Sequence, residues 1–467
     1  MLTSAIDLPS DPVLDPVLAH LTPDEVLAAC RAQLGLLEPA TRESWTCCRM
    51  IEALYHPHRY VRVAYALLSD PATPPNRVWP EGQVVYIHAP LRAPLSRRGT
   101  LLKLGGSPVE AYAFPDDRRL RGLRKFAGRA AAVSTWQEWL IRSGENLQLQ
   151  PDSLRRVLLR YVPEQKWLVR LRATGHVMDG LAEAPRTILS SSAERTPLNK
   201  RSIAVRAAGR TACAELLIRH LRLAETGAPA FRVPGVVGVD LDRGLLATEW
   251  LRGHTLLEAL AGSDASQVIG RVVRALRSFH RTVIPALDLL TPDDCRRRAA
   301  GALHDLSAAC PALSARLRHL GRALHRRLRT LAPAAPVTLH NDFHWNQIRM
   351  EPDRLTILDL ERLRCGDPWI DVANYATQLR MLAYRPEHAV DHQTAEAWRA
   401  EFLEQWSRGA DRAANSNAFR CYSVLSLLEL ARGMLRHLRC GWPALAEHCV
   451  NQAETEFAAP AGKVLVP

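Results

Sequence analysis

The pattern of apolar and polar residues divides the 467-residue chain into strand-like and helical stretches. In the first part, residues 60–65 and 84–87 alternate between apolar and polar or are solidly β-branched, which predicts strands. A helical pattern follows over residues 114–143. We therefore expect residues 1–150 to form an N-terminal α/β extension, and the sequence gives no role for it.

The next part of the chain is again mainly strand-like and contains one helix. Strands are predicted at residues 167–172, 187–189 and 202–206, and a helix over residues 211–224. We expect residues 151–255 to form a small β-rich lobe.

From residue 256 onward the pattern is mainly helical. One helix carries an apolar stripe at the 3.6-residue spacing that buries one helix face. The stripe consists of Val268, Ile269, Val272, Val273, Leu276 and Phe279. We therefore expect residues 256–467 to form a larger helical lobe.

A short internal echo links the extension to the small lobe. Residues 55–63 and 161–169 both begin with Tyr-x-Pro, continue through a polar, basic turn and end in a strand. Two interpretations remain open: the extension is a degenerate second copy of the small-lobe sheet, or two unrelated hairpins share their turn chemistry.

Length and composition indicate a globular protein of two or three domains, because 47% of the residues are apolar. The 61 Lys and Arg residues exceed the 48 Asp and Glu residues and give a net charge of +13. The arginines are scattered along helices, and no groove-reading or base-stacking motif accompanies them. A nucleic-acid-binding protein is thus the weakest interpretation, and we expect no nucleic-acid partner.

The cysteines and the apolar runs bear on localisation. None of the ten cysteines forms a Cys-x-x-Cys pair, which favours a reducing cytoplasm and no structural metal. The N-terminus lacks a basic-then-apolar signal segment, and no run of about 18 apolar residues occurs. We expect a cytoplasmic protein without a membrane partner.

The clearest chemical pattern lies between residues 339 and 361. Asp342 comes two residues after His340, a carboxamide follows at Gln347, and Asp359 ends an apolar, strand-like run. Phosphoryl transfer needs such groups, because one carboxylate orients the acceptor hydroxyl while a second carboxylate and an amide oxygen bind Mg²⁺. This ordered set is harder to obtain by chance than a single Asp, which is common in turns.

These residues resemble the aminoglycoside phosphotransferase and choline kinase-like family, whose catalytic loop reads roughly His-Gly-Asp-hydrophobic-His-Pro-x-Asn. That family continues with a strand ending in the metal-binding Asp and a Gly-Asp-Pro-x-x-Asp segment, here residues 366–371. The resemblance covers roughly residues 155–440. It implies an α+β, bilobal protein-kinase-like fold with a small β-rich lobe and a larger helical lobe, to which the N-terminal α/β extension is added. Asp367 and Asp371 suit a helix N-terminus, and no catalytic role is expected for them.

The resemblance also implies roles for the residues of the catalytic loop. Asp342 is the catalytic Asp, His340 shapes the loop through packing and hydrogen bonds, and Asp359 binds Mg²⁺. The family has Asn where this chain has Gln347, and Asn346 lies one position earlier. The second metal contact is therefore open between these two residues, and Gln347 is favoured.

Nucleotide-binding residues are expected in the small lobe, again by resemblance. Arg206 takes the place of the usual strand Lys that contacts the α- and β-phosphates, and Glu215 on the following helix orients it. Lys200 is the alternative cation, and Arg206 is then an ordinary surface residue. The backbone near Glu249 and Trp250 is expected to bind the adenine edge.

Together these features predict an ATP-dependent phosphotransferase that transfers the γ-phosphate to a hydroxyl of a small-molecule metabolite or antibiotic. ATP, Mg²⁺ and a small hydroxylated substrate are the expected ligands. The alternative is a catalytically weak or inactive kinase-like regulatory or binding module, which Arg206 and Gln347 favour. Retention of both Asp342 and Asp359 favours the enzyme. The sequence gives neither the substrate nor the oligomeric state.

Overall fold

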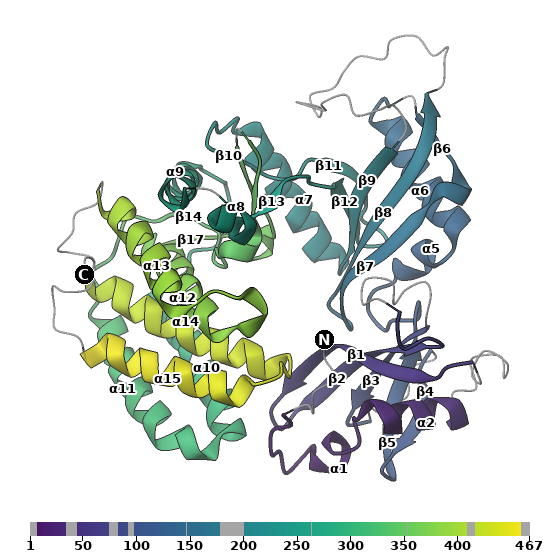
Figure 1. Ribbon diagram of the computed structural model, residues 1–467, viewed down its shortest axis with the longest axis horizontal. Coiled ribbons are helices and arrows are strands. Elements are labelled where there is room, and N and C mark those ends of the chain that lie inside the picture. Colours follow the sequence, from purple (N-terminus) through teal and green to yellow (C-terminus); the bar gives the residue numbers. More distant parts are fainter. Residues whose placement is uncertain are drawn as a thin grey trace. The chain divides into compact units, whose positions relative to one another are not determined.

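The computed structural model describes most of the chain as two compact units (Figure 1). The described residues are 7–33, 44–73, 83–91, 98–145, 147–177, 200–262, 264–352, 354–408 and 416–458. Unit 1 comprises Met1–Ile218, Gly235–Trp250 and Arg436–Cys440, and unit 2 comprises Arg219–Pro234, Leu251–Leu435 and Gly441–Pro467. We describe each unit by itself.

The first sheet of unit 1 is antiparallel and has the strand order β1-β2-β3-β5-β4. Its strands are β1 (Cys47–His56), β2 (Tyr60–Leu68), β3 (Gln83–Ala89), β4 (Thr100–Leu104) and β5 (Ser107–Ala113). Two helices precede it, α1 (Asp15–Leu18) and α2 (Pro23–Gln33). The strands predicted at residues 60–65 and 84–87 are confirmed by β2 and β3.

The second sheet of unit 1 has the order β11-β12-β9-β8, and both β6 and β7 pair with β8. Its strands are β6 (Leu147–Leu149), β7 (Arg155–Val162), β8 (Lys166–Val177), β9 (Lys200–Ala207), β11 (Val236–Asp240) and β12 (Leu245–Glu249), and α7 (Arg210–Glu225) follows β9. The strands predicted at 167–172 and 202–206 and the helix predicted at 211–224 are confirmed. The strand predicted at 187–189 lies outside the described residues.

One hydrophobic core joins the two sheets of unit 1. It contains alternate residues of the second sheet, such as Val169, Leu171 and Val205, and one face of the first sheet, including Tyr86. Helices α5 (Leu123–Ala127) and α6 (Arg129–Arg142) contribute large aromatic side chains to it, and Figure 1 shows them beside the second sheet. The helical prediction for residues 114–143 is confirmed by these helices. Burial of one sheet face explains the two-residue apolar period of the strands.

The two sheets share one strand order. Reading β7-β8-β9-β12-β11 in the second sheet gives the same connectivity as β1-β2-β3-β5-β4 in the first. In both, three strands follow in chain order, and the last two strands form a hairpin whose second member pairs with the third strand.

The turn of the first hairpin is held by a buried aspartate. Asp11 accepts hydrogen bonds through Oδ2 from the hydroxyl of Tyr55 and the backbone N–H of His58, both at 2.8 Å. Its Oδ1 accepts the backbone N–H groups of Val13 and Leu14 at 3.0 and 3.2 Å. His58 has a positive φ of 57°, a conformation that needs such support in a residue with a side chain.

The second sheet repeats this arrangement 106 positions later. Oδ2 of Asp117 accepts the hydroxyl of Tyr161 at 2.8 Å and the N–H of Glu164 at 3.0 Å, while Oδ1 accepts the N–H groups of Arg119 and Leu120 at 2.8 and 2.9 Å. The Asp-to-Tyr separation is 44 residues in both sheets, and Glu164 has a φ of 62°.

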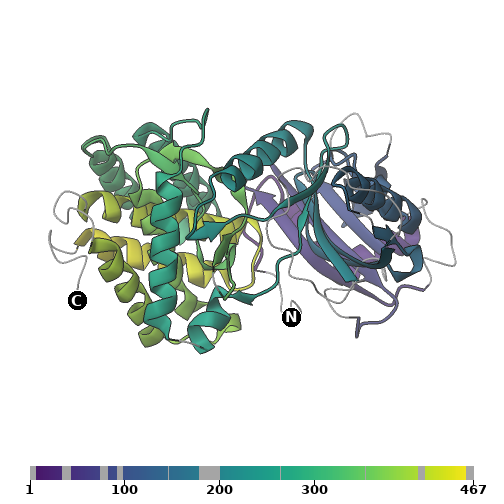
Figure 2. The ribbon, with the colours of Figure 1, turned by 90° about the horizontal axis from the view of Figure 1, so that it is seen from above.

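Unit 2 consists mainly of helices packed side by side (Figure 2). They are α8 (Leu256–Gly262), α9 (Ala265–Arg281), α10 (Pro292–Ala309), α11 (Ser314–Arg329), α12 (Trp369–Arg380), α13 (His392–Ser407), α14 (Ser416–Arg436) and α15 (Trp442–Ala458). The carboxylate of Asp264 caps α9 by accepting the N–H groups of Ser266 and Gln267. All six residues of the predicted apolar stripe on α9 are buried.

Short strands of unit 2 position the loops between the helices. β14 (Val337–Leu339) pairs with β17 (Arg364–Gly366). A second sheet has the order β10-β16-β15-β13, formed by β10 (Phe231–Arg232), β16 (Leu355–Ile357), β15 (Ile348–Met350) and β13 (His254–Thr255). Within the described ranges, none of the helices combines the length and apolarity that crossing a membrane requires.

Candidate active site

Two loops that carry the predicted carboxylates are brought together in unit 2. Asp342 follows β14, and Asp359 follows β16. The short 3₁₀ turn Trp345–Gln347 leads from the first loop into β15, which pairs antiparallel with β16. The N–H of Leu358 extends this pairing by donating to the carbonyl of Gln347 at 2.8 Å. The chain thus returns to the first loop over the 17 positions from Asp342 to Asp359.

His340 links the two loops from inside the unit. Its side chain is fully buried, and its Nε2 lies 2.7 Å from the carbonyl oxygen of Leu358, one residue before Asp359. The imidazole also contacts the rings of Phe279 and Phe343. These contacts connect the loop that carries His340 to the residue before Asp359.

Asp371 holds the backbone of the catalytic loop. It lies in the first turn of α12 and is fully buried, and its two oxygens accept the backbone N–H groups of His340 at 2.8 Å and Asn341 at 2.7 Å. Nε2 of His280 lies 3.1 Å from the same carboxylate. The sequence places Asp371 only at a helix start, and the structure adds this role as an anchor of the loop.

Asn341 needs this anchoring because its backbone is left-handed, with a φ of 60°. Its Nδ2 donates to the carbonyl of Arg362 at 3.0 Å, and its Oδ1 accepts Nη1 of Arg298 at 2.8 Å. Arg298 is in turn paired with Glu429 through two hydrogen bonds. On the far side of Asp342, Asn374 of α12 donates to the carbonyl of Phe343 at 2.9 Å. These contacts fix the backbone around Asp342.

The carboxylate of Asp342 itself remains accessible, with 33% of its side-chain surface exposed. Nη1 of Arg362 lies 4.0 Å from Oδ2 of Asp342, at the outer limit of an ion pair. Such a partly exposed pair contributes little to stability, so Asp342 is free to exchange this contact for another donor.

Asp359 also has a left-handed backbone, with a φ of 52° and a ψ of 67°. Asp tolerates this region better than most residues. Nη1 of Arg219 donates to the carbonyls of Leu360 and Glu361, which fixes the turn after Asp359. The turn directs the chain away from β16 immediately after the carboxylate.

The pKa of His344 is affected by the charges of both Asp342 and Asp359. Burial lowers the pKa of its imidazole to about 4, and the negative charges of Asp342 and Asp359 oppose this shift. His344 is therefore neutral at physiological pH. The charges of both Asp342 and Asp359 therefore reach this imidazole.

Gln347 and Asn346 also contact His344, in different ways. Nε2 of Gln347 lies 3.3 Å from Nε2 of His344, whereas Asn346 donates its backbone N–H to Nδ1 at 3.3 Å. The side chain of Asn346 belongs to an exposed residue and that of Gln347 to a half-buried one. Gln347 therefore contacts His344 through its carboxamide, whereas Asn346 contacts it through its backbone.

The small-lobe residues lie in unit 1. Arg206 is half-buried on β9, and Glu215 is exposed on α7. Burial raises the pKa of the Cys213 thiol on α7 to about 11, and the positive charge of Arg206 opposes this rise. Arg206 is thus within electrostatic reach of α7, the helix that carries Glu215.

The N–H groups of Glu249 and Trp250 are already used within unit 1. Glu249 donates its N–H to the carbonyl of Gly235 at 2.9 Å, and its carboxylate accepts the N–H of Gly235 at 2.8 Å. Trp250 donates its N–H to the carbonyl of Ser202 at 3.2 Å. Neither amide is available as a donor to a ligand in this arrangement.

A protein-family model decides which family the chain represents. Residues 141–415, more than half of the chain, match the model of the phosphotransferase enzyme family. The chain belongs to the phosphotransferase enzyme family. The resemblance inferred from the catalytic loop is thereby confirmed, and so is the α+β, protein-kinase-like fold class with a β-rich part followed by a helical part.

Several solved structures are similar to this phosphotransferase-family chain. A choline/ethanolamine kinase family protein from Mesorhizobium loti is 16% identical, and the match covers 62% of this chain and 85% of that chain with a TM-score of 0.42. A thermostable mutant of aminoglycoside phosphotransferase APH(4)-Ia, in a ternary complex with ADP and hygromycin B, is 15% identical (71% and 100% covered, TM-score 0.46). Choline kinase from Cryptosporidium parvum Iowa II is 13% identical (66% and 90% covered, TM-score 0.43). No curated protein matches the chain significantly.

The phosphotransferase-family chain brings together the site residues predicted within unit 2: His340, Asp342, Gln347 and Asp359. Those predicted within unit 1, Arg206, Glu215, Glu249 and Trp250, occupy one sheet and its helix. Across the described ranges, no cluster of three or more His, Cys, Asp or Glu side chains is arranged to hold a metal ion.

Proposed function

We propose that the protein transfers the γ-phosphate of ATP to a hydroxyl group of a small molecule. The observation that carries the proposal is that the loops of Asp342 and Asp359 are joined: His340 contacts the carbonyl of Leu358, and the N–H of Leu358 donates to the carbonyl of Gln347. Phosphoryl transfer depends on positioning and charge neutralisation, and both need carboxylates fixed by the backbone.

Asp342 is the residue we assign to the acceptor. Its carboxylate is accessible and its backbone is anchored on both sides, so it can accept a hydrogen bond from the hydroxyl and hold it in line with the phosphate. Arg362, 4.0 Å away, balances its charge in the absence of substrate. His344 stays neutral beside it and adds no competing positive charge.

Asp359 and Gln347 are the residues we assign to Mg²⁺, which neutralises phosphate charge when it is bound. Oxygen donors of this kind are the ligands that Mg²⁺ prefers. The 3.3 Å contact with His344 holds the Gln347 carboxamide beside the imidazole, and an amide oxygen has two lone pairs, one of which can serve the metal.

Arg206 is the residue we assign to the α- and β-phosphates, with Glu215 on α7 to orient it. A guanidinium binds phosphate through a fork of two N–H groups, which an ammonium lacks. For adenine, Glu249 and Trp250 can offer only backbone carbonyl oxygens, because their N–H groups already donate within the sheet. The adenine donor must then come from the residues that follow Trp250.

The acceptor class rests on the relatives. Choline kinase and the hygromycin B-bound phosphotransferase are named for small molecules, and we infer a small hydroxylated metabolite or antibiotic here as well. We expect the protein to act without nucleic acid or membrane and in the cytoplasm. A catalytically weak binding module is the alternative, since Arg206 and Gln347 replace the usual Lys and Asn.

The test combines nucleotide binding with turnover. Thermal melting with Mg²⁺ and ATP measures binding, and ADP release against pooled hydroxylated metabolites measures transfer. Asp342→Asn is expected to keep ATP binding and to lower turnover by at least about 100-fold. The control is Asp242→Asn, an exposed carboxylate of unit 1 with 83% of its side chain accessible, which leaves both readouts unchanged.

Two results would count against the proposal. Absence of any stabilisation by Mg²⁺ and ATP would remove the nucleotide. Stabilisation without turnover on any acceptor, equal in wild type and Asp342→Asn, would favour the binding module.

A further inference from the structure

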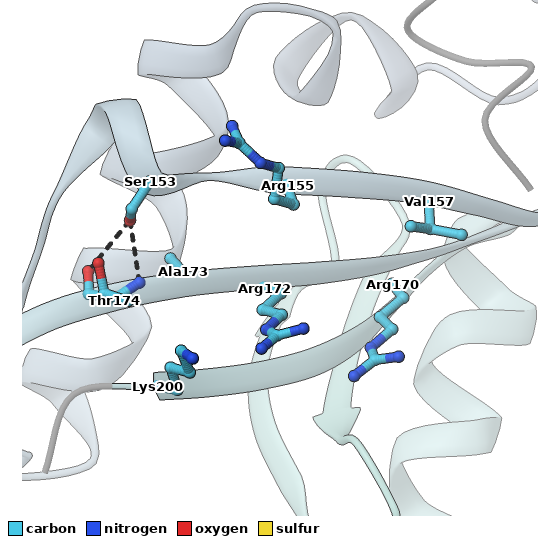
Figure 3. Close-up of a pocket in the computed structure, with 8 residues that line it drawn as sticks. All are labelled: Ser153, Arg155, Val157, Arg170, Arg172, Ala173, Thr174 and Lys200. Carbon is cyan, nitrogen blue, oxygen red and sulfur yellow. Dashed lines mark hydrogen bonds between the residues drawn. The ribbon is translucent and has the colours of Figure 1, made fainter. Parts of the chain in front are cut away.

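The second sheet of unit 1 has one buried face and one open, cationic face. Along β8, Val169, Leu171 and Ala173 are buried in the core, so the intervening residues project from the opposite face. These intervening residues include Arg170 and Arg172. Figure 3 shows their side chains next to each other on β8, with Arg155 on β7 and Lys200 on β9 to either side.

The register places like charges opposite each other. Arg155 on β7 is the direct partner of Arg172 on β8. On the other side of β8, Thr174 is the partner of Lys200, which puts Lys200 diagonally next to Arg172. Like charges in direct cross-strand positions destabilise a sheet unless a counter-charge lies between them. The arrangement therefore has a cost that a bound anion removes.

A cavity of about 340 Å³ lies between these side chains. The residues that matter for its chemistry are Ser153, Arg155, Arg170, Arg172, Thr174 and Lys200. Within the described part of the chain, no Asp or Glu lines it. The hydroxyl of Ser153 is bound to the backbone N–H and carbonyl of Thr174 at 2.9 and 3.3 Å, which fixes one wall (Figure 3).

Two carboxylates close in sequence to these strands pair with cations outside the cavity. Glu145 pairs with Arg201 at 2.8 Å, and Asp152 lies 3.8 Å from Arg129. Among the residues that the structure describes, no carboxylate forms an ion pair with any of the four cations that line the cavity. The positive charge of the cavity is therefore not neutralised by the described parts of the protein.

Arg170 gives a second sign that a polar partner fits here. Its guanidinium stacks on the ring of Trp250 at 4.2 Å, and its Nε is buried without a hydrogen-bond acceptor in the described structure. A buried donor without an acceptor costs free energy that a ligand oxygen recovers. The stack fixes the plane of the guanidinium, so its N–H groups are held in position before a ligand arrives.

We propose that this cavity is a second anion site, which takes a compact polyanion carrying phosphate groups. Arginine forks match the oxygens of phosphate, and four cations suit a ligand with several negative charges. The cavity is at the small end of ligand pockets, which favours an oligophosphate or a small phosphorylated metabolite over a bulky ligand. Lys200 and Arg206 are six residues apart on β9, or about 20 Å, while Arg170 faces Ala204, two residues from Arg206, so this site adjoins the one proposed for the ATP phosphates and extends away from it.

Isothermal titration of the full chain with inorganic tripolyphosphate tests the site at about physiological salt, where nonspecific attraction is screened. Wild type is expected to bind with one-to-one stoichiometry, and Arg172→Gln to bind at least about tenfold more weakly. The matched control is Arg201→Gln, the neighbouring β9 cation that is paired with Glu145 outside the cavity. It removes the same charge and leaves tripolyphosphate binding unchanged.

The melting temperature of each variant without ligand shows whether weaker binding is caused by misfolding. Because Arg172 faces Arg155, Arg172→Gln is expected to keep or raise the melting temperature of the free protein while losing the rise that tripolyphosphate produces. Arg206→Gln is expected to bind tripolyphosphate like wild type, which distinguishes this site from the one proposed for the ATP phosphates.

Three outcomes would overturn the proposal. They are no binding by wild type, equal weakening in Arg172→Gln and Arg201→Gln, or loss of tripolyphosphate binding in Arg206→Gln. The last result would place the anion in the ATP site instead.

Discussion

The two sheets of unit 1 have the same strand order and the same aspartate-anchored turn, yet β2 of the first sheet is buried on both faces, whereas β8 of the second sheet has one face open to solvent. Asp11 and Asp117 each hold a Tyr hydroxyl and a turn N–H. In both sheets the Asp and the Tyr that it binds are 44 residues apart in sequence. We propose from this that the N-terminal extension is a second, degenerate copy of the small-lobe sheet.

The two sheets differ in the face that carries Arg170 and Arg172 in the second sheet. Ala64 and Ala66 on β2 hold the positions of Arg170 and Arg172 on β8, and both alanines are fully buried in the shared core. The residue opposite Ala64 is Tyr86, which also belongs to this core. The first sheet therefore uses for packing the face that the second sheet keeps open. A sheet can retain its framework after its ligand-facing surface has been changed into a core.

The connections differ as well. Residues 208–235 separate β9 from β11 and contain the 16-residue helix α7, whereas only residues 90–99 separate β3 from β4. A helix of that length cannot fit between β3 and β4. The first sheet thus has no counterpart of Glu215, and we expect it to have no nucleotide role.

Exchanging the two faces gives the largest expected effect. Ala64→Arg buries a guanidinium in the shared core and is expected to destabilise the protein by about 4 kcal/mol or more. Arg170→Ala removes only an open-face cation stacked on Trp250 and is expected to cost about 1 kcal/mol or less. Urea unfolding followed by circular dichroism measures both changes. Tolerance of Ala64→Arg would mean that the first sheet also has an open face.

Unit 2 is expected to lose stability at a higher pH than the two sheets as the solution is acidified. The pKa of His344 is about 4 in the folded protein against an ordinary 6.5, so the unfolded chain binds more protons between these values. Stability from this group is complete above pH 6.5 and is lost as the pH falls to about 4, by up to about 3 kcal/mol. Urea midpoints from pH 7.5 to 4 measure the loss, and His344→Gln is expected to flatten the curve.

The sheets respond at lower pH. Burial alone raises the pKa of Asp11, but hydrogen bonds from the His58 amide and the Tyr55 hydroxyl outweigh it and lower the pKa below 3.8. Stability from Asp11 is therefore present above its ordinary value and lost only as the pH falls below it. A loss between pH 6.5 and 4 that persists in His344→Gln would assign the transition to another group.

The two turn anchors are expected to be equivalent. Tyr55→Phe and Tyr161→Phe each remove a 2.8 Å hydrogen bond to a buried carboxylate, and each is expected to cost about 2 kcal/mol. Chemical unfolding of the two variants side by side provides the comparison. A clear cost in one sheet and none in the other would show that the anchors do different things.

Equivalent positions on the third strands are expected to differ in function. Arg206→Gln should raise the KM for ATP by about tenfold and leave stability unchanged, because it removes a phosphate contact. His88→Gln at the matching position of β3 should leave KM unchanged and lower stability, because Nδ1 of His88 accepts a hydrogen bond from buried Arg62 at 3.1 Å. Steady-state kinetics and thermal melting of both variants test the contrast. A KM effect in His88→Gln would give the first sheet a role in nucleotide binding.

Local patterns were enough to predict much of this fold. Strands at 60–65 and 202–206 and the apolar stripe of α9 follow from periodicity, which is a property of neighbouring residues. The catalytic loop was recognisable because His340, Asp342, Gln347 and Asp359 lie close together in sequence. The echo at Tyr55 and Tyr161 was visible for the same reason.

Contacts between distant segments could not be predicted in this way. Asp371 binds the amides of residues 340 and 341, about 30 positions earlier, and a carboxylate in the first turn of a helix gives no local sign of such a partner. Likewise, Asp11 and Asp117 lie 44 residues before their tyrosines. The use of the Glu249 and Trp250 amides depends on strand pairing, which the apolar pattern alone leaves open.

The most direct measurement of the central claim is the Mg²⁺ dependence of ATP binding. Titration of wild type with ATP in Mg²⁺ and in EDTA is expected to give affinities that differ by at least about tenfold, because Asp359 and the phosphates share the ion. Asp342→Asn should keep this difference, and Asp359→Asn should abolish it. An unchanged Mg²⁺ dependence in Asp359→Asn would contradict the assignment of the metal site.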